Sequence, residues 1–346
     1  MRLQETDCGR NQPRTQAGSS RSTRRDALRI QSFDDSAKSL KIVMASSKHF
    51  AARLRHREKH HKLIASLIYR DASPPTIIRI IEKFGPSSRT DNNVAADVLR
   101  SALHCVRRAK FRSRSQFLMT CGGFLRCVWP RGLVVSNPSK PSSRDLDTLR
   151  AAARRAGNTF LQEFLPQLRK ITRCIALGID CSNGLNRSAE FVYIRDLHDG
   201  RVWVTGKSYP TIGQEGEIVC FPMKSHLLEV ESKEILVLGC HDLNLFSNRA
   251  LTATKVGSPR HRRIKDMRRT IRTGKATETV LHHPHWTDSA NIWKTALSGL
   301  EKIVKPKVFA SSGRWWRNGL RRRMKLNICL ARTGSNDVAS VIIREA

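Results

Sequence analysis

The residue with the clearest capacity for chemistry is Cys240. It follows an apolar run at 235–238 that is typical of a buried strand, and His241 and Asp242 come directly after it. A thiol at the carboxyl end of a strand, where the chain turns, is a position at which α/β enzymes present nucleophiles. The chain has nine cysteines and no Cys-x-x-Cys pair, so we expect no disulfide framework and no structural zinc site. Most of the cysteines are expected to be small buried hydrophobes, and Cys240 is the candidate nucleophile.

Candidate partners of this thiol lie upstream, around a predicted hairpin. Strands predicted at 189–194 and 202–205 are joined through Asp199-Gly200, which is typical of a tight hairpin turn. Lys207 follows the second strand, and Glu215 comes eight positions later. Beside a thiol, an ammonium group lowers the thiol pKa and stabilises a developing oxyanion, while a carboxylate can accept the thiol proton.

Taken in order, these motifs resemble the nitrilase superfamily of carbon–nitrogen hydrolases. The nucleophile motif of that family reads apolar strand, Cys, aromatic residue, Asp, then Phe and Arg. This chain has Cys240, Asp242, Phe246 and Arg249 in that order, with His241 at the aromatic position. The hairpin with its Lys, and a later strand ending near Pro284, match further parts of the family pattern. The resemblance spans residues 133–313.

The resemblance implies an α/β fold, specifically an α-β-β-α sandwich in which two sheets pack face to face between helical layers. It implies a thiol-dependent hydrolase of a small amide, with Cys240, Lys207 and Glu215 as catalytic residues, and also a homo-oligomer with no cofactor and no metal. The general-base Glu of the family follows a Pro, and here Ser139 stands in that position. Either Glu190 or Glu215 supplies the base, or the chain is impaired or inactive.

Two other classes of function stay open. Residues 176–180 lead through Asp180 into two hairpin strands, which is similar to the opening of ribonuclease-H-like nucleases; Asp180, Asp242 and Asp288 would then hold two divalent ions. A non-catalytic nucleic-acid-binding protein is the second alternative. Four histidines could also form a metal site with Asp242, although their spacing fits no standard ligand pattern: His241, His282, His283 and His285.

The charge is unevenly distributed along the chain. With 63 Lys and Arg against 29 Asp and Glu, the formal net charge is +34. Residues 1–170 carry 34 basic and 13 acidic side chains, 171–255 carry 9 and 10, and 256–346 carry 20 and 6. We therefore expect weak, non-specific nucleic-acid binding through the basic flanks. No apolar run is long enough for a membrane helix or resembles a secretory signal, so we expect a cytoplasmic protein.

The hydropathy pattern divides the chain into four parts. Residues 1–48 are polar and predict a disordered basic segment. Residues 49–132 predict a basic, mainly helical region with helices at 63–68, 77–81 and 94–106. Residues 133–313 alternate strands with helices and predict the α/β domain. Residues 314–346 predict a basic tail that contains Trp315-Trp316.

Overall fold

The computed structural model of the chain describes residues 40–42, 63–69, 73–83, 92–184, 186–272, 278–287, 290–315 and 325–345. All of them belong to one compact unit, Ala37–Ala346. No helix among these residues is both long and apolar enough to cross a membrane.

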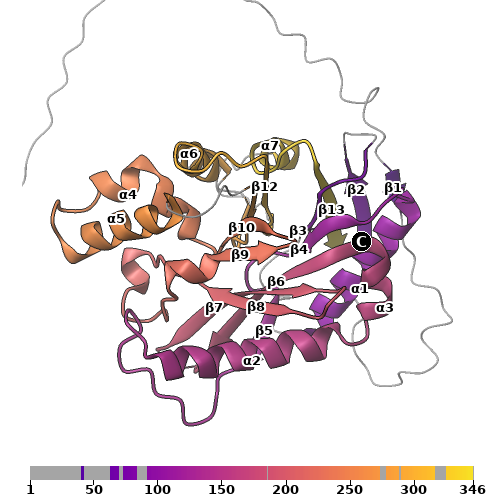
Figure 1. Cartoon of the computed structure of the whole chain (residues 1–346). Coiled ribbons are helices and arrows are strands. Elements are labelled where there is room, and N and C mark those ends of the chain that lie inside the picture. The colour runs from indigo at the N-terminus through magenta and orange to yellow at the C-terminus, as the bar shows by residue number, and fades with distance from the viewer. Residues whose placement is uncertain are drawn as a thin grey trace, which may run out of the picture. The chain divides into compact units, whose positions relative to one another are not determined.

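A large mixed sheet forms one half of this unit (Figure 1). Its strands run in the order β1-β2-β13-β3-β4-β6-β7-β8, and β5 pairs with β6 beside this path. The central neighbours β13, β3, β4 and β6 are parallel, whereas β6, β7 and β8 form an antiparallel meander. The strands are β1 Leu40–Ile42, β2 Leu63–Ile68, β3 Ile77–Lys83, β4 Ser115–Met119, β5 Leu125–Val128, β6 Thr172–Ser182, β7 Ser188–Asp196, β8 Val202–Gly206 and β13 Val338–Glu345.

A smaller sheet packs face to face with the large one. Its order is β12-β11-β10-β9, and β10, β11 and β12 are parallel. An apolar cluster between the sheets joins Phe117, Ala176 and Ile194 of the large sheet to Val237 and Leu281 of the small one. The strands are β9 Leu227–Val230, β10 Lys233–Leu238, β11 Thr279–His282 and β12 Val308–Ser311.

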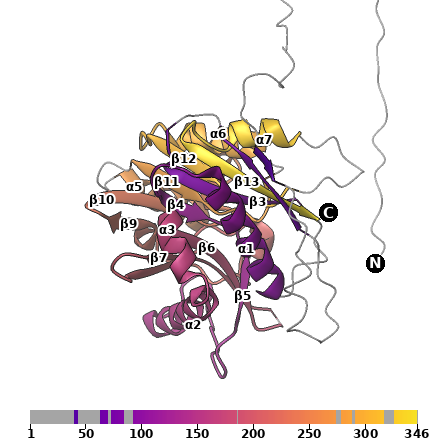
Figure 2. The same cartoon turned by 90° about the vertical axis from the view of Figure 1, so that its right-hand side faces the viewer.

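Helices cover the outer face of each sheet, as Figure 2 shows. Helices α1 (Asn92–Ala109), α2 (Ser143–Leu161) and α3 (Leu165–Ile171) pack on the large sheet. Helices α5 (Pro259–Arg272) and α6 (Ala290–Leu300), with the short helix η4 (Asp242–Phe246), pack on the small sheet. The remaining helices are α4 (Asn248–Thr252), α7 (Leu326–Arg332), η2 (Ile212–Gln214) and η3 (Met223–His226). The predicted α-β-β-α sandwich is confirmed by this layering.

The strand sequences explain why both faces of the large sheet are covered. Consecutive side chains of a strand point to opposite faces. Along β4, Phe117 and Met119 face the small sheet, whereas Leu118 faces the outer helices. Because both faces are buried, the central strands are continuously apolar instead of alternating.

Continuous apolarity is also the reason why two predicted helices are wrong. Residues 63–68 form β2, and the segment predicted as a helix at 77–81 belongs to β3. The first six residues of β3 are all buried, and four of them are isoleucines, which favour strands. A short apolar run of this kind has no periodicity that separates strand from helix. The third predicted helix, at 94–106, is confirmed as part of α1.

The predicted boundaries at residues 133 and 313 cut through this fold. Strands β2 to β5 precede residue 133, and β13, predicted as tail, lies between β2 and β3 in the large sheet. Arg314 is buried, and its Nε lies 3.0 Å from Glu82 Oε2. Strand β1 falls within the segment predicted to be disordered, whereas residues 1–39 and 43–48 lie outside the described residues, as does Trp316.

Other local predictions agree with the structure. Helix α2 begins with a capping box between Ser142 and Asp145. The β7–β8 hairpin turns at Gly200, which has a φ of +77°. Strands β9 and β10 are joined through Glu231 and Ser232, both with positive φ, as a tight hairpin turn requires.

Candidate active site

Cys240 lies just beyond the carboxyl edge of the small sheet. Strands β10 and β11 are parallel, with Leu238 opposite His282, so the loops that follow them meet at one edge. The His285 backbone N–H donates a hydrogen bond to Cys240 Sγ at 3.4 Å. Cys240 is buried, with 8% of its surface exposed.

The large sheet contributes a row of three charged side chains. Asp180 on β6 is directly opposite Glu190 on β7. Lys207 follows β8, and its backbone N–H donates to the Glu190 carbonyl at 2.9 Å, one position beyond the register pair Phe191 and Gly206. Residues opposite each other in antiparallel strands project to the same face. Asp180, Glu190 and Lys207 therefore lie side by side.

The Lys207 side chain is fully buried and is held by two acceptors. Its Nζ donates to Glu190 Oε1 at 3.0 Å and to Gln214 Oε1 at 2.8 Å. A buried ammonium group needs such partners, because its desolvation is otherwise costly. The second carboxylate oxygen, Glu190 Oε2, is buried and accepts no hydrogen bond from any described residue.

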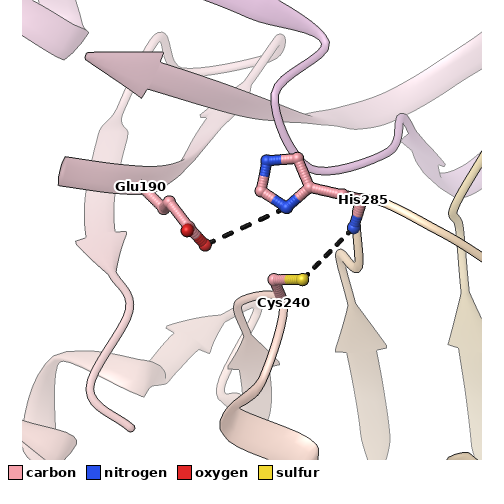
Figure 3. A group of neighbouring side chains, drawn as sticks. All are labelled: Glu190, Cys240 and His285. Atoms are coloured by element: carbon pink, nitrogen blue, oxygen red, sulfur yellow. Dashed lines mark hydrogen bonds and ion pairs between the residues drawn. The ribbon is translucent and has the colours of Figure 1, made fainter. Parts of the chain in front are cut away.

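Glu190, Cys240 and His285 converge on one small volume (Figure 3). Each offers a potential ligand atom, and these three atoms lie within 4.8 Å of one another. Glu190 Oε2 is 4.0 Å from His285 Nδ1. The cluster thus combines a nucleophilic sulfur, an imidazole and a carboxylate with an uncommitted oxygen.

On its other side, His285 is paired with Asp180. Its Nε2 lies 3.0 Å from Asp180 Oδ2 and 3.2 Å from Oδ1. Burial lowers the pKa of His285, but its contacts with Asp180 and Cys240 together outweigh burial, and the pKa lies well above its usual value. Burial raises the pKa of Asp180, but the charge and hydrogen bond of His285, together with the charges of Arg314 and Arg126, outweigh burial and leave that pKa below its usual range. An imidazolium between two carboxylates is therefore the form that this arrangement favours.

A glycine turn closes over the Asp180–His285 pair. Gly123 has a φ of +60°, and a Cβ there would lie 2.4 Å from Asp180 Oδ2 and 2.9 Å from His285 Nε2. Only glycine combines this conformation with so close an approach. Arg314 fixes the turn by donating to the carbonyls of Gly122 and Gly123 at 3.0 and 2.6 Å.

Asp242 joins the segment that carries Lys207 to the turn that carries Cys240. Its Oδ1 accepts the backbone N–H groups of Ser208 and Tyr209 at 2.9 and 2.8 Å, and Oδ2 accepts that of Gly239 at 2.9 Å. The carboxylate is fully buried. It positions both segments, and it does not belong to the group of potential metal ligands found among the described residues.

Two sequence-predicted positions lie away from this cluster. Glu215 forms an ion pair with Arg260, and 44% of its side chain is exposed. Its neighbour Gln214 contacts Lys207 instead, because the η2 turn directs the residue before Glu215 inward. Ser139 lines a different cavity, with Cys220 among its neighbours, and Cys240, Lys207 and Glu190 are absent from that lining.

The remaining histidines do not gather around a metal position. His282 Nε2 pairs with the Cys240 carbonyl at 3.1 Å, and His283 Nδ1 pairs with the Thr120 carbonyl at 2.7 Å. Burial lowers the pKa of His282 to about 3 and that of His283 and His241 to about 4. These three rings are therefore neutral at pH 7 and line the surroundings of the site. Of the four histidines, His285 alone belongs to the cluster of potential metal ligands found among the described residues.

The nuclease alternative lacks its carboxylate cluster. Asp180 pairs with His285, Asp242 accepts backbone N–H groups, and Asp288 lies outside the described residues. The group of potential metal ligands found among the described residues contains neither Asp180 nor Asp242. The structure therefore does not favour that alternative.

Comparison with known proteins gives similarity at the level of solved structures. No protein-family model and no curated protein matches the chain. A variant of the amidase from Nesterenkonia sp. AN1, with acrylamide added at its active-site cysteine, is 14% identical with a TM-score of 0.39, covering 68% of this chain and 78% of that one. A variant of the same amidase in complex with butyramide is 14% identical with a TM-score of 0.39, covering 70% and 79%. A third structure, described as an amidase from the nitrilase superfamily, is 15% identical with a TM-score of 0.38, covering 70% and 79%.

Proposed function

We propose that the chain is a thiol-dependent hydrolase of carbon–nitrogen bonds that acts on a small amide, with Cys240 as nucleophile. The observation that carries the proposal is the position of the Glu190 carboxylate, whose Oε2 atom is buried. One oxygen is held by Lys207, and the other belongs to the cluster with Cys240 and accepts no hydrogen bond from the described residues. A carboxylate in this position can accept the thiol proton. The motif resemblance to carbon–nitrogen hydrolases supports the same chemistry.

In the proposed reaction, Glu190 takes the thiol proton, and the sulfur electron pair forms a bond to the amide carbon. The carbonyl π electrons move to oxygen and create an oxyanion. When this intermediate collapses, the amine leaves with the proton from Glu190, and a thioester remains on Cys240. Glu190 then deprotonates a water molecule, which attacks the thioester, and the proton returns to the sulfur.

Lys207 is proposed to stabilise the oxyanion. Its ammonium group has three N–H donors, and the structure commits two of them, to Glu190 and Gln214. The third is available for the developing charge, which a buried, preorganised donor stabilises more strongly than water does.

The test compares Cys240→Ala, Glu190→Gln and the matched control Glu215→Gln by ammonia release from short aliphatic amides. We expect no turnover from Cys240→Ala and a loss of about 10²–10⁴-fold in kcat from Glu190→Gln, the size of a general-base contribution. Glu215→Gln removes an exposed ion pair and is expected to stay close to the wild type. Turnover by Cys240→Ala would refute the nucleophile, and loss in Glu215→Gln alone would move the base to Glu215.

Alkylation gives a measurement that does not depend on knowing the substrate. Burial raises the pKa of Cys174 to about 12 and that of Cys105 to about 11, so both are expected to react slowly with iodoacetamide. A hydrogen bond with Cys181 lowers the pKa of the partly buried Cys127, so the experiment uses a Cys127→Ser background. Cys240 is expected to be labelled fastest among the described cysteines; labelling no faster than Cys174 would exclude it as nucleophile.

The homo-oligomer, the cytoplasmic location and the weak binding of nucleic acid through the basic flanks stay predictions. Because residues 133–313 alone would lack six strands of the large sheet, binding must be measured on the full chain. We expect affinity for DNA to fall steeply with salt and to be the same for unrelated sequences. A strong preference for one sequence would contradict this interpretation.

A further inference from the structure

The cluster at Cys240 contains three different donor atoms. Cys240 offers a sulfur from the turn after β10, His285 a ring nitrogen from the loop after β11, and Glu190 a carboxylate oxygen from β7 (Figure 3). The three atoms lie within 4.8 Å of one another. Hard ions such as Mg²⁺ and Ca²⁺ take oxygen ligands, whereas a thiolate with an imidazole and a carboxylate is a donor set for Zn²⁺ and similar transition metals.

The surroundings of the cluster orient these donors. Asp180 Oδ2 lies 3.0 Å from His285 Nε2, so Nε2 carries a hydrogen and donates it to the carboxylate. The other ring nitrogen, Nδ1, then faces Glu190. Metal-binding histidines are oriented by a carboxylate on the far ring nitrogen in the same way. Lys207 occupies Glu190 Oε1 and leaves the buried Oε2 without a hydrogen bond among the described residues.

We propose that Glu190, Cys240 and His285 bind one Zn²⁺ ion or a similar divalent transition metal, and that the bound metal blocks the thiol. The inference concerns the site of the proposed hydrolase but does not depend on hydrolysis. In a tetrahedral site with typical Zn–N and Zn–O distances, a nitrogen ligand and an oxygen ligand such as His285 Nδ1 and Glu190 Oε2 lie about 3.4 Å apart. The observed 4.0 Å between Glu190 Oε2 and His285 Nδ1 needs only a small side-chain rotation to reach it.

Charge balance favours a divalent ion. Coordination replaces two protons, the thiol proton of Cys240 and the Nδ1 proton of the His285 imidazolium; both are released to solvent, and the metal takes the lone pairs that they leave on the sulfur and on Nδ1. The thiolate, Asp180 and Glu190 supply three negative charges, and Lys207 supplies one positive charge next to Glu190. A divalent ion makes the buried set neutral, which is the condition for a low desolvation cost. Because the sulfur lone pair forms the metal bond, it is no longer available for attack on a substrate.

The experiment titrates metal-free, full-length protein with Co²⁺ and follows the thiolate-to-cobalt charge-transfer absorption. We expect one Co²⁺ per chain and stoichiometric displacement by Zn²⁺. The band is expected to vanish in Cys240→Ala, to weaken strongly in His285→Asn, and to persist in the control Cys127→Ser. Asp180→Asn, which removes only the group that orients His285, is expected to lower the affinity by about 10–100-fold.

A second readout separates this inference from the proposed function. Saturating Zn²⁺ is expected to protect Cys240 from iodoacetamide in wild type and not in His285→Asn, whether or not any amide is hydrolysed. A charge-transfer band that survives in Cys240→Ala, or the absence of stoichiometric binding by a folded wild type, would overturn the metal site. Metal binding by a protein that hydrolyses no amide even when metal-free would refute the hydrolase and leave the metal site standing.

Discussion

Asp242→Asn is expected to destabilise the protein and to weaken the site at the same time. The Asp242 carboxylate accepts three buried backbone N–H groups, from Ser208, Tyr209 and Gly239. These bonds join the segment after Lys207 to the turn before Cys240. An asparagine retains one oxygen acceptor and places an NH₂ donor where the second oxygen was, so it cannot satisfy both segments.

The magnitude follows from the bonds that are lost. If the asparagine oxygen keeps Ser208 and Tyr209, the Gly239 N–H faces another donor and is left unsatisfied, at a cost of about 1–3 kcal/mol. Replacing a charged acceptor by a neutral one weakens the two remaining bonds by about 1 kcal/mol in total. We therefore expect the free energy of unfolding to fall by about 2–4 kcal/mol.

Urea denaturation followed by circular dichroism measures this loss, with Asp199→Asn as control. Asp199 accepts bonds within its own surface turn, from Arg201, so its replacement is expected to leave the free energy of unfolding close to that of the wild type. The alkylation rate of Cys240 is measured below the unfolding transition and is expected to change only in Asp242→Asn. If Asp242→Asn is no more destabilising than Asp199→Asn, the carboxylate does not hold the two segments together.

Three further substitutions test other parts of the structure. Arg314→Met leaves the Glu82 carboxylate buried without its ion-pair partner and is expected to cost about 3–5 kcal/mol in urea denaturation. Gly299→Ala would place a Cβ 1.9 Å from the Phe246 carbonyl oxygen, and overpacking is expected to lower the thermal midpoint by the equivalent of about 1–3 kcal/mol. Burial lowers the pKa of His282 to about 3, so its contribution to stability is present above the unfolded pKa of about 6.5 and falls by about 1.4 kcal/mol per pH unit below it. In His282→Gln, the decline of stability between pH 6.5 and 3 is expected to be shallower than in wild type.

Each of these substitutions has a control that differs in environment. Arg269→Met removes an exposed helix pair and is expected to change stability by no more than about 1 kcal/mol. Gly213→Ala adds a Cβ with no atom within 4 Å. His198→Gln replaces an exposed histidine. Equal effects from a substitution and its control would refute the packing argument behind it.

The sequence predicts the parts of the fold that depend on local signals. The capping box at Ser142, the turn at Gly200 and the apolar strand before Cys240 are all encoded within a few residues, and the structure contains each of them. The segment at 77–81 could not be assigned in this way, because its isoleucines are buried by contacts from both sides of the sheet. The place of β13 between β2 and β3 depends on a pairing across more than 250 residues, for which the sequence holds no local signal.

The candidate site was only partly predictable for the same reason. Cys240 and Lys207 follow from motifs, whereas Glu215 was chosen by its spacing and points to Arg260. The register of the β7–β8 hairpin identifies the carboxylate beside Lys207 better than the spacing does. A tight turn at Gly200 fixes the β7–β8 pairing, and extending it by one step beyond Phe191 and Gly206 sets Glu190 against Lys207. His285 was named only as one of four histidines of a possible metal site; that it alone of the four joins Glu190 and Cys240 depends on contacts between the two sheets.

The site exists only where the two sheets meet. The large sheet supplies Asp180, Glu190 and Lys207 as a row across three strands, and the small sheet supplies Cys240 and His285 from two parallel strand ends. The His285–Asp180 contact therefore crosses from one sheet to the other. A shift of one sheet on the other by even 1 Å would move the sulfur relative to its carboxylate, and errors of that size are costly for catalytic groups. It follows that the apolar cluster between the sheets determines the geometry of the site as much as the charged residues do.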